Sequence, residues 1–190
     1  LLQDDNVDVV KAAVENAGRT RNALFLPLLI QKLESNKIRR LARQALINYG
    51  EDALDNLEKA FNDPHTNFRI VALIPRVLSE INHQRSVDIL FSKISVHDAL
   101  LKTNIIRALN KLRTNFDSLK FDKKIINNLI DDETKNYYMT FSLLDTFQKN
   151  ANLEDLTEQD QKSLELITKS LDEQLSFILD RIFQLIAIIY

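Results

Sequence analysis

Three histidines, His65, His83 and His97, are the side chains best suited to bind a transition metal, because the sequence contains no cysteine. Two of them, His65 and His97, lie 32 positions apart. Packed helices lie about 8–10 Å apart, so imidazoles on adjacent helices cannot share a metal ion without adjustment. We therefore predict that the histidines are turn residues and that the chain binds no metal.

Carboxylate pairs are the next candidates for chemistry, and they occur at Asp4-Asp5, Glu51-Asp52 and Asp131-Asp132. Each pair lies where we expect a helix to begin, and the positive end of a helix dipole favours anions. Helix capping therefore explains the pairs better than acid–base catalysis. The sequence has no Gly-x-Ser-x-Gly motif, and two glycines are too few for a phosphate-binding loop. We predict a non-catalytic chain without a cofactor.

Basic residues cluster at Arg39, Arg40 and Arg43 on one expected helix. Other cations recur at matching repeat positions, which would align them along one face: Lys11 with Arg43, and Arg76 with Arg107. Such a column suits an acidic peptide or a nucleic acid. A solvated helix face with acidic partners is the alternative. The net charge of −2 favours this alternative, so we expect no direct binding of nucleic acid.

Aromatic residues cluster at Tyr137, Tyr138 and Phe141. Aromatic rings can stack on nucleic-acid bases. Tyr137 and Phe141 are four positions apart and so share one helix face, which favours packing in a core.

The composition predicts helices as the elements that carry these residues. The chain has 190 residues, of which 45% are hydrophobic and 27% charged, with two glycines and three prolines. Sheet proteins need more turn residues than this. The apolar stretch 182–190 is too short to span a bilayer, which takes about 20 apolar residues. Because the chain begins with Leu1 and shows no signal peptide, we expect a piece of a larger protein.

A repeat organises the first part of the chain. Residues 9–18 read VVKAAVENAG and residues 41–50 read LARQALINYG, a period of 32 that aligns Gly18 with Gly50. Apolar residues at i, i+1, i+4 and i+5 predict one helix face in each block. We expect a residue that tolerates the left-handed conformation to end each such helix. Two further copies follow near 73–82 and 105–112.

A second block follows each first block, at 27–33, 55–61, 88–94 and 124–129. Residues Leu29, Leu57, Leu90 and Ile125 align in these blocks, as do Leu33, Phe61, Ile94 and Leu129. Polar connectors at 34–36, 62–65 and 131–132 suit the caps of the following helices. The pattern predicts about four helical hairpins stacked over residues 1–132.

The remaining residues 133–190 predict C-terminal helices that complete or cap the stack as one continuous domain. We expect a helix near 133–149, a loop at 150–160, a cap box at Thr157–Asp160 and a long helix from about 160 to the end. The apolar stripe expected on that helix consists of Leu164, Ile167, Leu171, Leu175, Ile178 and Ile182. Past Arg181 the helix is apolar on several faces, which predicts burial against the stack or against missing sequence.

The blocks NVDVVKAAVENAG at 6–18 and LARQALINYGEDAL at 41–54 resemble HEAT repeats of the phycobilisome-lyase-like type. Pro75 lies inside a first helix, as the kinking proline of HEAT repeats does. The glycine is absent from the third and fourth units, which departs from that pattern. The resemblance covers about residues 5–130 and implies an all-α, armadillo-like superhelix, or solenoid, whose second helices line a concave face.

The repeats followed by RALNKLR at 107–113 and DRIFQLIAIIY at 180–190 resemble the soluble section of certain bacterial membrane proteins. Those proteins join an ADP/ATP-translocase-like or major-facilitator-like region to HEAT repeats, and a cyclic-nucleotide-binding domain often follows. The resemblance implies a cytoplasmic segment, on the inner-membrane side, that contacts the membrane through flanking segments alone.

Together these patterns predict a non-catalytic scaffold for protein interaction or regulation, whose partner is another protein or a flanking domain of the same chain. We identify no small-molecule site. The candidate interaction surface consists of Gln31, Lys32, Arg39, Arg40, Arg43, Glu58, Lys59, Ser92 and Lys93. A lyase-like enzyme and a HEAT-like nucleic-acid-binding module remain the alternatives. Fold analogy alone supports the first, and the arginines alone support the second.

Overall fold

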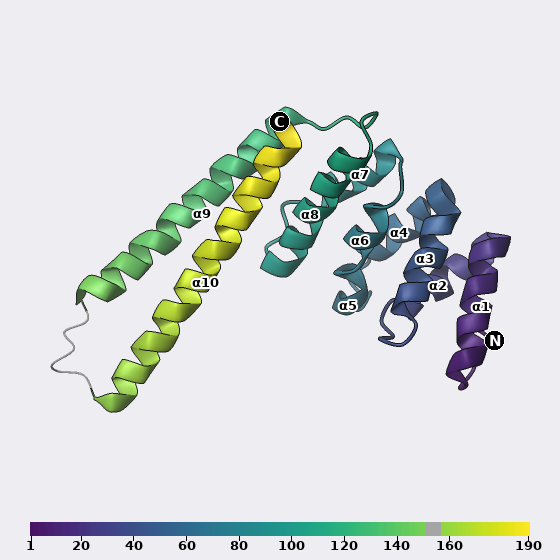
Figure 1. Cartoon of the computed structure of the whole chain (residues 1–190), viewed down its shortest axis with the longest axis horizontal. Helices are drawn as coiled ribbons and strands as arrows, with labels where there is room; N and C mark the ends of the chain where they lie inside the picture. Colours follow the sequence, from purple (N-terminus) through teal and green to yellow (C-terminus); the bar gives the residue numbers. More distant parts are fainter. Residues whose placement is uncertain (151–156) are drawn as a thin grey trace. The chain divides into compact units, whose positions relative to one another are not determined.

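The computed structural model describes residues 1–150 and 157–190, and every regular element in these residues is a helix. The chain divides into two compact units, Leu1–Phe121 and Asp122–Tyr190. Each unit has its own set of packed helices (Figure 1). The all-helical class predicted from the scarcity of turn residues is confirmed for the described residues.

The first unit contains eight α-helices joined by short connections. They are α1 (Val7–Thr20), α2 (Leu26–Lys32), α3 (Arg39–Tyr49), α4 (Leu54–Asn62), α5 (Phe68–Val71), α6 (Ile74–Leu78), α7 (Gln84–Ser92) and α8 (Ala99–Asn115). Single 3-10 turns, η1 (Ala23–Phe25) and η2 (Gly50–Ala53), precede α2 and α4.

Alternate helices of the first unit pack against one another in two rows. Helix α3 contacts α1 and α6, and α6 contacts α8, while α4 contacts both α2 and α7. The predicted second blocks at 27–33, 55–61 and 88–94 fall on α2, α4 and α7. Their aligned residues Leu29 and Leu57 are fully inaccessible to solvent, as is Leu90. The register predicted for these three helices is therefore correct.

The two glycines have different roles. Gly50 follows α3 with a φ of 60°, a conformation that side chains disfavour, so it ends the helix as expected. Gly18 lies inside α1, and the left-handed residue that ends this helix is Arg21. A Cβ on Gly18 would lie 2.9 Å from the Cα of Ala45. The prediction of Gly18 as a helix end is wrong, because the residue allows α1 to approach α3 closely.

Pro75 divides the first helix of the third repeat into two short helices, α5 and α6. Proline has no backbone N–H to donate four residues back, so a helix cannot continue through it without a break. Pro75 lies in the first turn of α6, where a missing N–H is tolerated. The backbone N–H of Arg69 bonds to the side chain of Asn67, which caps α5.

The second unit consists of two long helices, α9 (Lys123–Asn150) and α10 (Glu158–Ile189), that pack against each other. The block at 124–129 begins α9 and does not form a short second helix of its own. The predicted connector Asp131-Asp132 lies within α9, so its capping role is wrong, and Asp132 instead pairs with Lys135 one turn later. A boundary at residue 132 would fall inside this helix.

Helix α10 begins with the predicted cap box, in which Thr157 and Asp160 bond to each other's backbone N–H. The expected loop at 150–160 falls mostly on residues 151–156, which lie outside the described residues. Of the predicted stripe, Leu171, Leu175 and Ile178 are buried, while Ile167 is exposed.

The apolar end of α10 is buried on one side only. Leu185 and Ile188 are buried, whereas Phe183 and Tyr190 are exposed. What covers the exposed side stays a prediction.

Candidate functional site

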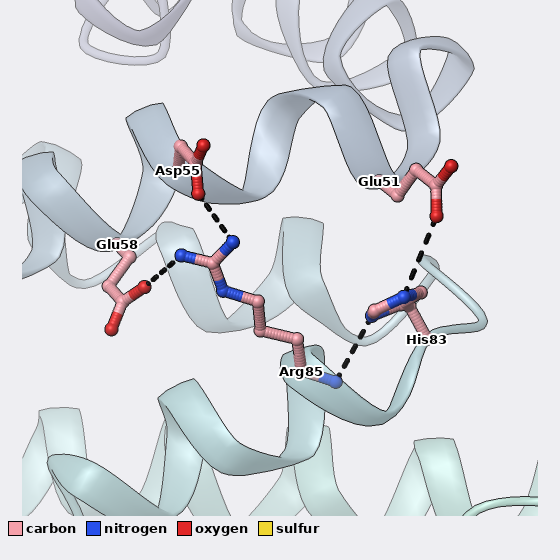
Figure 2. A network of polar contacts seen from close by, with 5 residues as sticks. All are labelled: Glu51, Asp55, Glu58, His83 and Arg85. Atoms are coloured by element: carbon pink, nitrogen blue, oxygen red, sulfur yellow. Dashed lines mark hydrogen bonds and ion pairs between the residues drawn. The ribbon is translucent and has the colours of Figure 1, made fainter.

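Charged side chains connect α4 and its preceding turn with the start of α7 (Figure 2). Arg85 forms ion pairs with Asp55 and Glu58, and its Nη2 donates to Glu58 Oε2 at 2.7 Å. Hydrogen bonds to Glu58 and then to Asp55 raise the pKa of Arg85 above its ordinary value. The guanidinium therefore joins two turns of α4 to α7.

His83 extends this network at the first turn of α7. Its Nδ1 accepts a hydrogen bond from the backbone N–H of Arg85 at 3.1 Å, so the imidazole caps the helix. Because Nδ1 is an acceptor, the ring proton belongs on Nε2, which lies 3.5 Å from Glu51 Oε2. The charged and polar side chains in Figure 2 are paired with one another, so this junction holds α4 and α7 together.

The equivalent junction between α2 and α4 is open. A groove of about 400 Å³ lies there, with Ile30, Ala60 and Ile70 among its apolar lining residues. The polar lining residues are Gln31, Asn56, Lys59, Asp63, His65, Thr66 and Asn67. This volume falls within the range of about 300–1,000 Å³ that is typical of ligand-binding clefts.

Three side chains lining this groove are uncommitted. Within the described part of the chain, Gln31, Asn56 and Lys59 make no side-chain hydrogen bond or ion pair. Asn67, by contrast, donates its amide N–H to Glu34 Oε1 at 2.8 Å. An apolar lining with free amide groups can hold a segment that itself carries both apolar and peptide groups.

The structure brings together part of the predicted surface. Gln31 and Lys59 line the same groove, whereas Glu58 is committed to Arg85. Ser92 donates its hydroxyl to the carbonyl of Ile89 in its own helix. Lys32 and Lys93 are half-buried and line none of the described clefts.

The three arginines at the start of α3 separate into two kinds. Arg39 turns back to α2, donating from Nε to the carbonyl of Leu33 at 2.8 Å and from Nη2 to that of Glu34 at 3.3 Å. It therefore caps the preceding helix. Arg40 is exposed, and Arg43 is half-buried beside α6.

The remaining candidates for chemistry are dispersed. In residues 1–150 and 157–190, no three His, Asp or Glu side chains form a group that could hold a metal ion. His65 lines the α2–α4 groove, and His97 is exposed in the turn before α8. Of the aromatic cluster, Tyr137 packs on a core cluster, but Tyr138 is 66% exposed. Phe141, which we predicted to pack in the core with Tyr137, is 49% exposed, so that prediction is correct for Tyr137 and wrong for Phe141.

Neither the place of Asn56 in the groove nor the ion pairs of Arg85 were predicted from the sequence. The carboxylates of Asp55 and Glu58 are three positions apart on α4. Arg85 lies on α7, which is the second helix of the following repeat. That spacing was a usable signal for an ion-paired junction. The buried pair of Glu133 and Arg181 gave no such signal, because the two residues lie 48 positions apart.

No family model matches the chain, and no curated protein matches it. Among solved structures, the crystal structure of an engineered protein aligns with a TM-score of 0.38 and 16% identity. The alignment covers 95% of this chain and 77% of that one, and so low a score carries no argument. No helix in the described residues combines the length and apolar character needed to cross a bilayer.

Proposed function

We propose that this chain is a non-catalytic scaffold of HEAT-like helical repeats that binds an extended segment of a partner protein between α2 and α4. One observation carries the proposal, namely the groove of about 400 Å³ whose polar lining includes Gln31, Asn56 and Lys59. A peptide in extended conformation presents N–H and C=O groups that amide side chains can bind in either sense. The apolar lining offers contact to its side chains.

The neighbouring junction supports this choice of site. Arg85 fastens α4 to α7, so the second helices there cannot separate without loss of two ion pairs. A rigid junction beside an open one gives the groove a fixed wall, and preformed sites bind with a smaller loss of conformational entropy.

A random 12-residue peptide library, displayed on phage and selected on the full chain, tests the proposal. Selected peptides are then measured by fluorescence anisotropy on the wild type and on Asn56→Ala/Lys59→Ala. We expect the double variant to bind about tenfold more weakly, which corresponds to one or two lost hydrogen bonds.

Lys93→Ala is the control, because it also removes an ammonium group, here at the end of α7, and Lys93 lies outside the groove. It should leave the affinity unchanged. If the selected peptides bind the double variant as tightly as the wild type, the groove is not their site and the proposal fails.

We further propose, from the sequence resemblance, that the chain is the cytoplasmic section of a bacterial transporter-like membrane protein related to ADP/ATP translocases. The scaffold would then contact flanking domains of its own chain. Extending the reading frame on both sides of the chain tests this. Transmembrane helices upstream support it, whereas a soluble upstream neighbour and a stop codon shortly after Tyr190 contradict it.

A further inference from the structure

Three arginines lie on two adjacent first helices of the first unit. Arg40 and Arg43 lie on α3, and Arg76 lies on α6, which packs directly against α3. Arg43 and Arg76 are 33 positions apart, one more than the repeat period of 32, so Arg76 directly follows Pro75, which holds the place that matches Arg43. In the described residues, none of the three side chains makes a hydrogen bond or an ion pair.

Arg43 is held in an environment that disfavours its charge. Its Nε is buried and has no hydrogen-bond partner among the described residues. Burial, followed by repulsion from Arg76, lowers the pKa of Arg43, and Arg40 adds further repulsion. Attraction to Glu80 raises the pKa of Arg43; it is weaker than burial and the repulsion from Arg76 but stronger than the repulsion from Arg40. A folded chain tolerates such a cluster at a cost in stability, which is typical of binding sites.

The carboxylate of Glu80 does not neutralise the cluster, because it is already paired with Lys111 of α8. Lys11 occupies the place that matches Arg43 in the preceding repeat, and its ammonium pairs with Asp8 at 2.9 Å. The first repeat thus pairs its own cation, whereas Arg40, Arg43 and Arg76 have no ion-paired carboxylate among the described residues.

We propose that Arg40, Arg43 and Arg76 bind carboxylate side chains of a short acidic segment of a partner protein. A guanidinium holds a carboxylate through two parallel hydrogen bonds, which an unpaired arginine can still supply. Helices α3 and α6 are adjacent, and packed helices lie about 8–10 Å apart. A polyproline II segment has three residues per turn and rises about 3.1 Å per residue, so acidic residues at i and i+3 lie on one face about 9 Å apart and match this spacing.

The surroundings favour a short acidic peptide over a long polyanion. Helix α1, which packs on α3, exposes Asp8 and Glu15. A nucleic acid that continued along the row of first helices would therefore meet carboxylates. The chain as a whole carries a net charge of −2, which gives no general attraction for nucleic acids.

Fluorescence anisotropy on the full chain tests the proposal. The probe is a labelled 12-residue peptide with Glu at every third position and Ser or Gly between, and the control peptide has Gln in place of each Glu. We expect the Glu peptide to bind at least about tenfold more tightly than the Gln peptide, and its affinity to fall with added salt. Equal binding of both peptides, or tighter binding of a labelled dT12 oligonucleotide, overturns the proposal.

Arg76→Gln should weaken binding of the Glu peptide about tenfold, and Arg76→Lys should weaken it less because the charge remains. Arg69→Gln, at an exposed arginine of α5, is the control and should have no effect. The melting temperature of Arg76→Gln should equal or exceed that of the wild type, since repulsion of Arg43 is removed. Unchanged binding in both Arg76 variants overturns the assignment.

This site is independent of the groove between α2 and α4. Asn56→Ala/Lys59→Ala should leave binding of the Glu peptide unchanged, and Arg76→Gln should leave binding of groove-selected peptides unchanged. Loss of Glu-peptide binding in the groove variant would place that peptide in the groove and overturn the arginine site.

Discussion

An arginine joins two helices in each unit, but in opposite surroundings. In the first unit, Arg85 reaches from α7 to Asp55 and Glu58 of α4, at an exposed junction. In the second unit, Arg181 of α10 donates from Nε and Nη2 to Glu133 of α9 at 2.8 and 2.6 Å. Arg181 is 7% exposed and Glu133 only 1%.

The difference shows how burial changes the structural role of an arginine–carboxylate ion pair. Water screens the pairs of Arg85, so they fasten an interface that apolar residues already build. Glu133 and Arg181 occupy a core in which an unpaired charge costs far more. In a long antiparallel pair of helices, many registers bury apolar residues equally well. A buried ion pair disfavours all registers but one, as we infer for α9 and α10.

The largest expected effect comes from breaking the buried pair. Glu133→Ala leaves Arg181 buried without its carboxylate, so we expect α9 and α10 to lose about 3–5 kcal/mol of unfolding free energy. Urea denaturation followed by circular dichroism measures this loss. The double variant Glu133→Leu/Arg181→Met removes both charges and should recover most of it. A loss below about 1 kcal/mol for Glu133→Ala would show that solvent reaches the pair and that the contrast with Arg85 is absent.

A core residue between the partners of Arg85 gives the next largest effect. Leu57 lies on α4 between Asp55 and Glu58 and is 0% exposed. Leu57→Ala should lower the unfolding free energy by about 2–5 kcal/mol, because it leaves a cavity beneath the ion pairs. Thermal and urea denaturation check this value. A loss below about 0.5 kcal/mol, as surface substitutions give, would contradict the register of α4.

Removal of the exposed arginine should have a small effect. Arg85→Gln should lower the unfolding free energy far less than Leu57→Ala does, because water screens both pairs. The difference from wild type should shrink in about 1 M NaCl, where charges are screened within about 3 Å. Arg69→Gln, at an exposed arginine without an ion pair among the described residues, is the matched control. A loss as large as that of Leu57→Ala would mean that Arg85 determines the junction.

The smallest effect concerns a fully exposed carboxylate at the start of α10. Hydrogen bonds from the side chain and then the backbone of Thr157 hold the pKa of Asp160 below its ordinary value. A lowered folded pKa contributes stability above the unfolded pKa of about 3.9 and loses it as pH falls through the folded value. NMR should therefore show the first turn of α10 fraying at acid pH below about 3.9. Asp160→Asn should remove this pH dependence, and identical titrations would contradict the cap box.

Much of the first unit follows from local sequence. The apolar second blocks at 27–33, 55–61 and 88–94 predicted α2, α4 and α7, and Pro75 predicted the kink that separates α5 from α6. Gln31 and Lys59 were expected on one surface because equivalent repeat positions face the same way. Each of these features depends on residues within one or two helical turns, so its pattern can be recognised in a single sequence.

Tertiary structure decided the rest. A glycine such as Gly18 can end a helix or allow another helix to pack closely. Only the proximity of Ala45 on α3 shows that Gly18 has the second role. The continuous α9 conflicts with the connector predicted at Asp131-Asp132, because acidic residues are tolerated on the exposed side of a long helix.

The sequence by itself determined the helical class and the register of α2, α4 and α7, because helix periodicity is local. Only the tertiary structure decided which polar groups neutralise one another. The partners of Arg85 and Arg181, and the unpaired state of Arg43, depend on which distant helices pack together. Electrostatic energies follow distance and burial in space, and separation along the chain fixes neither.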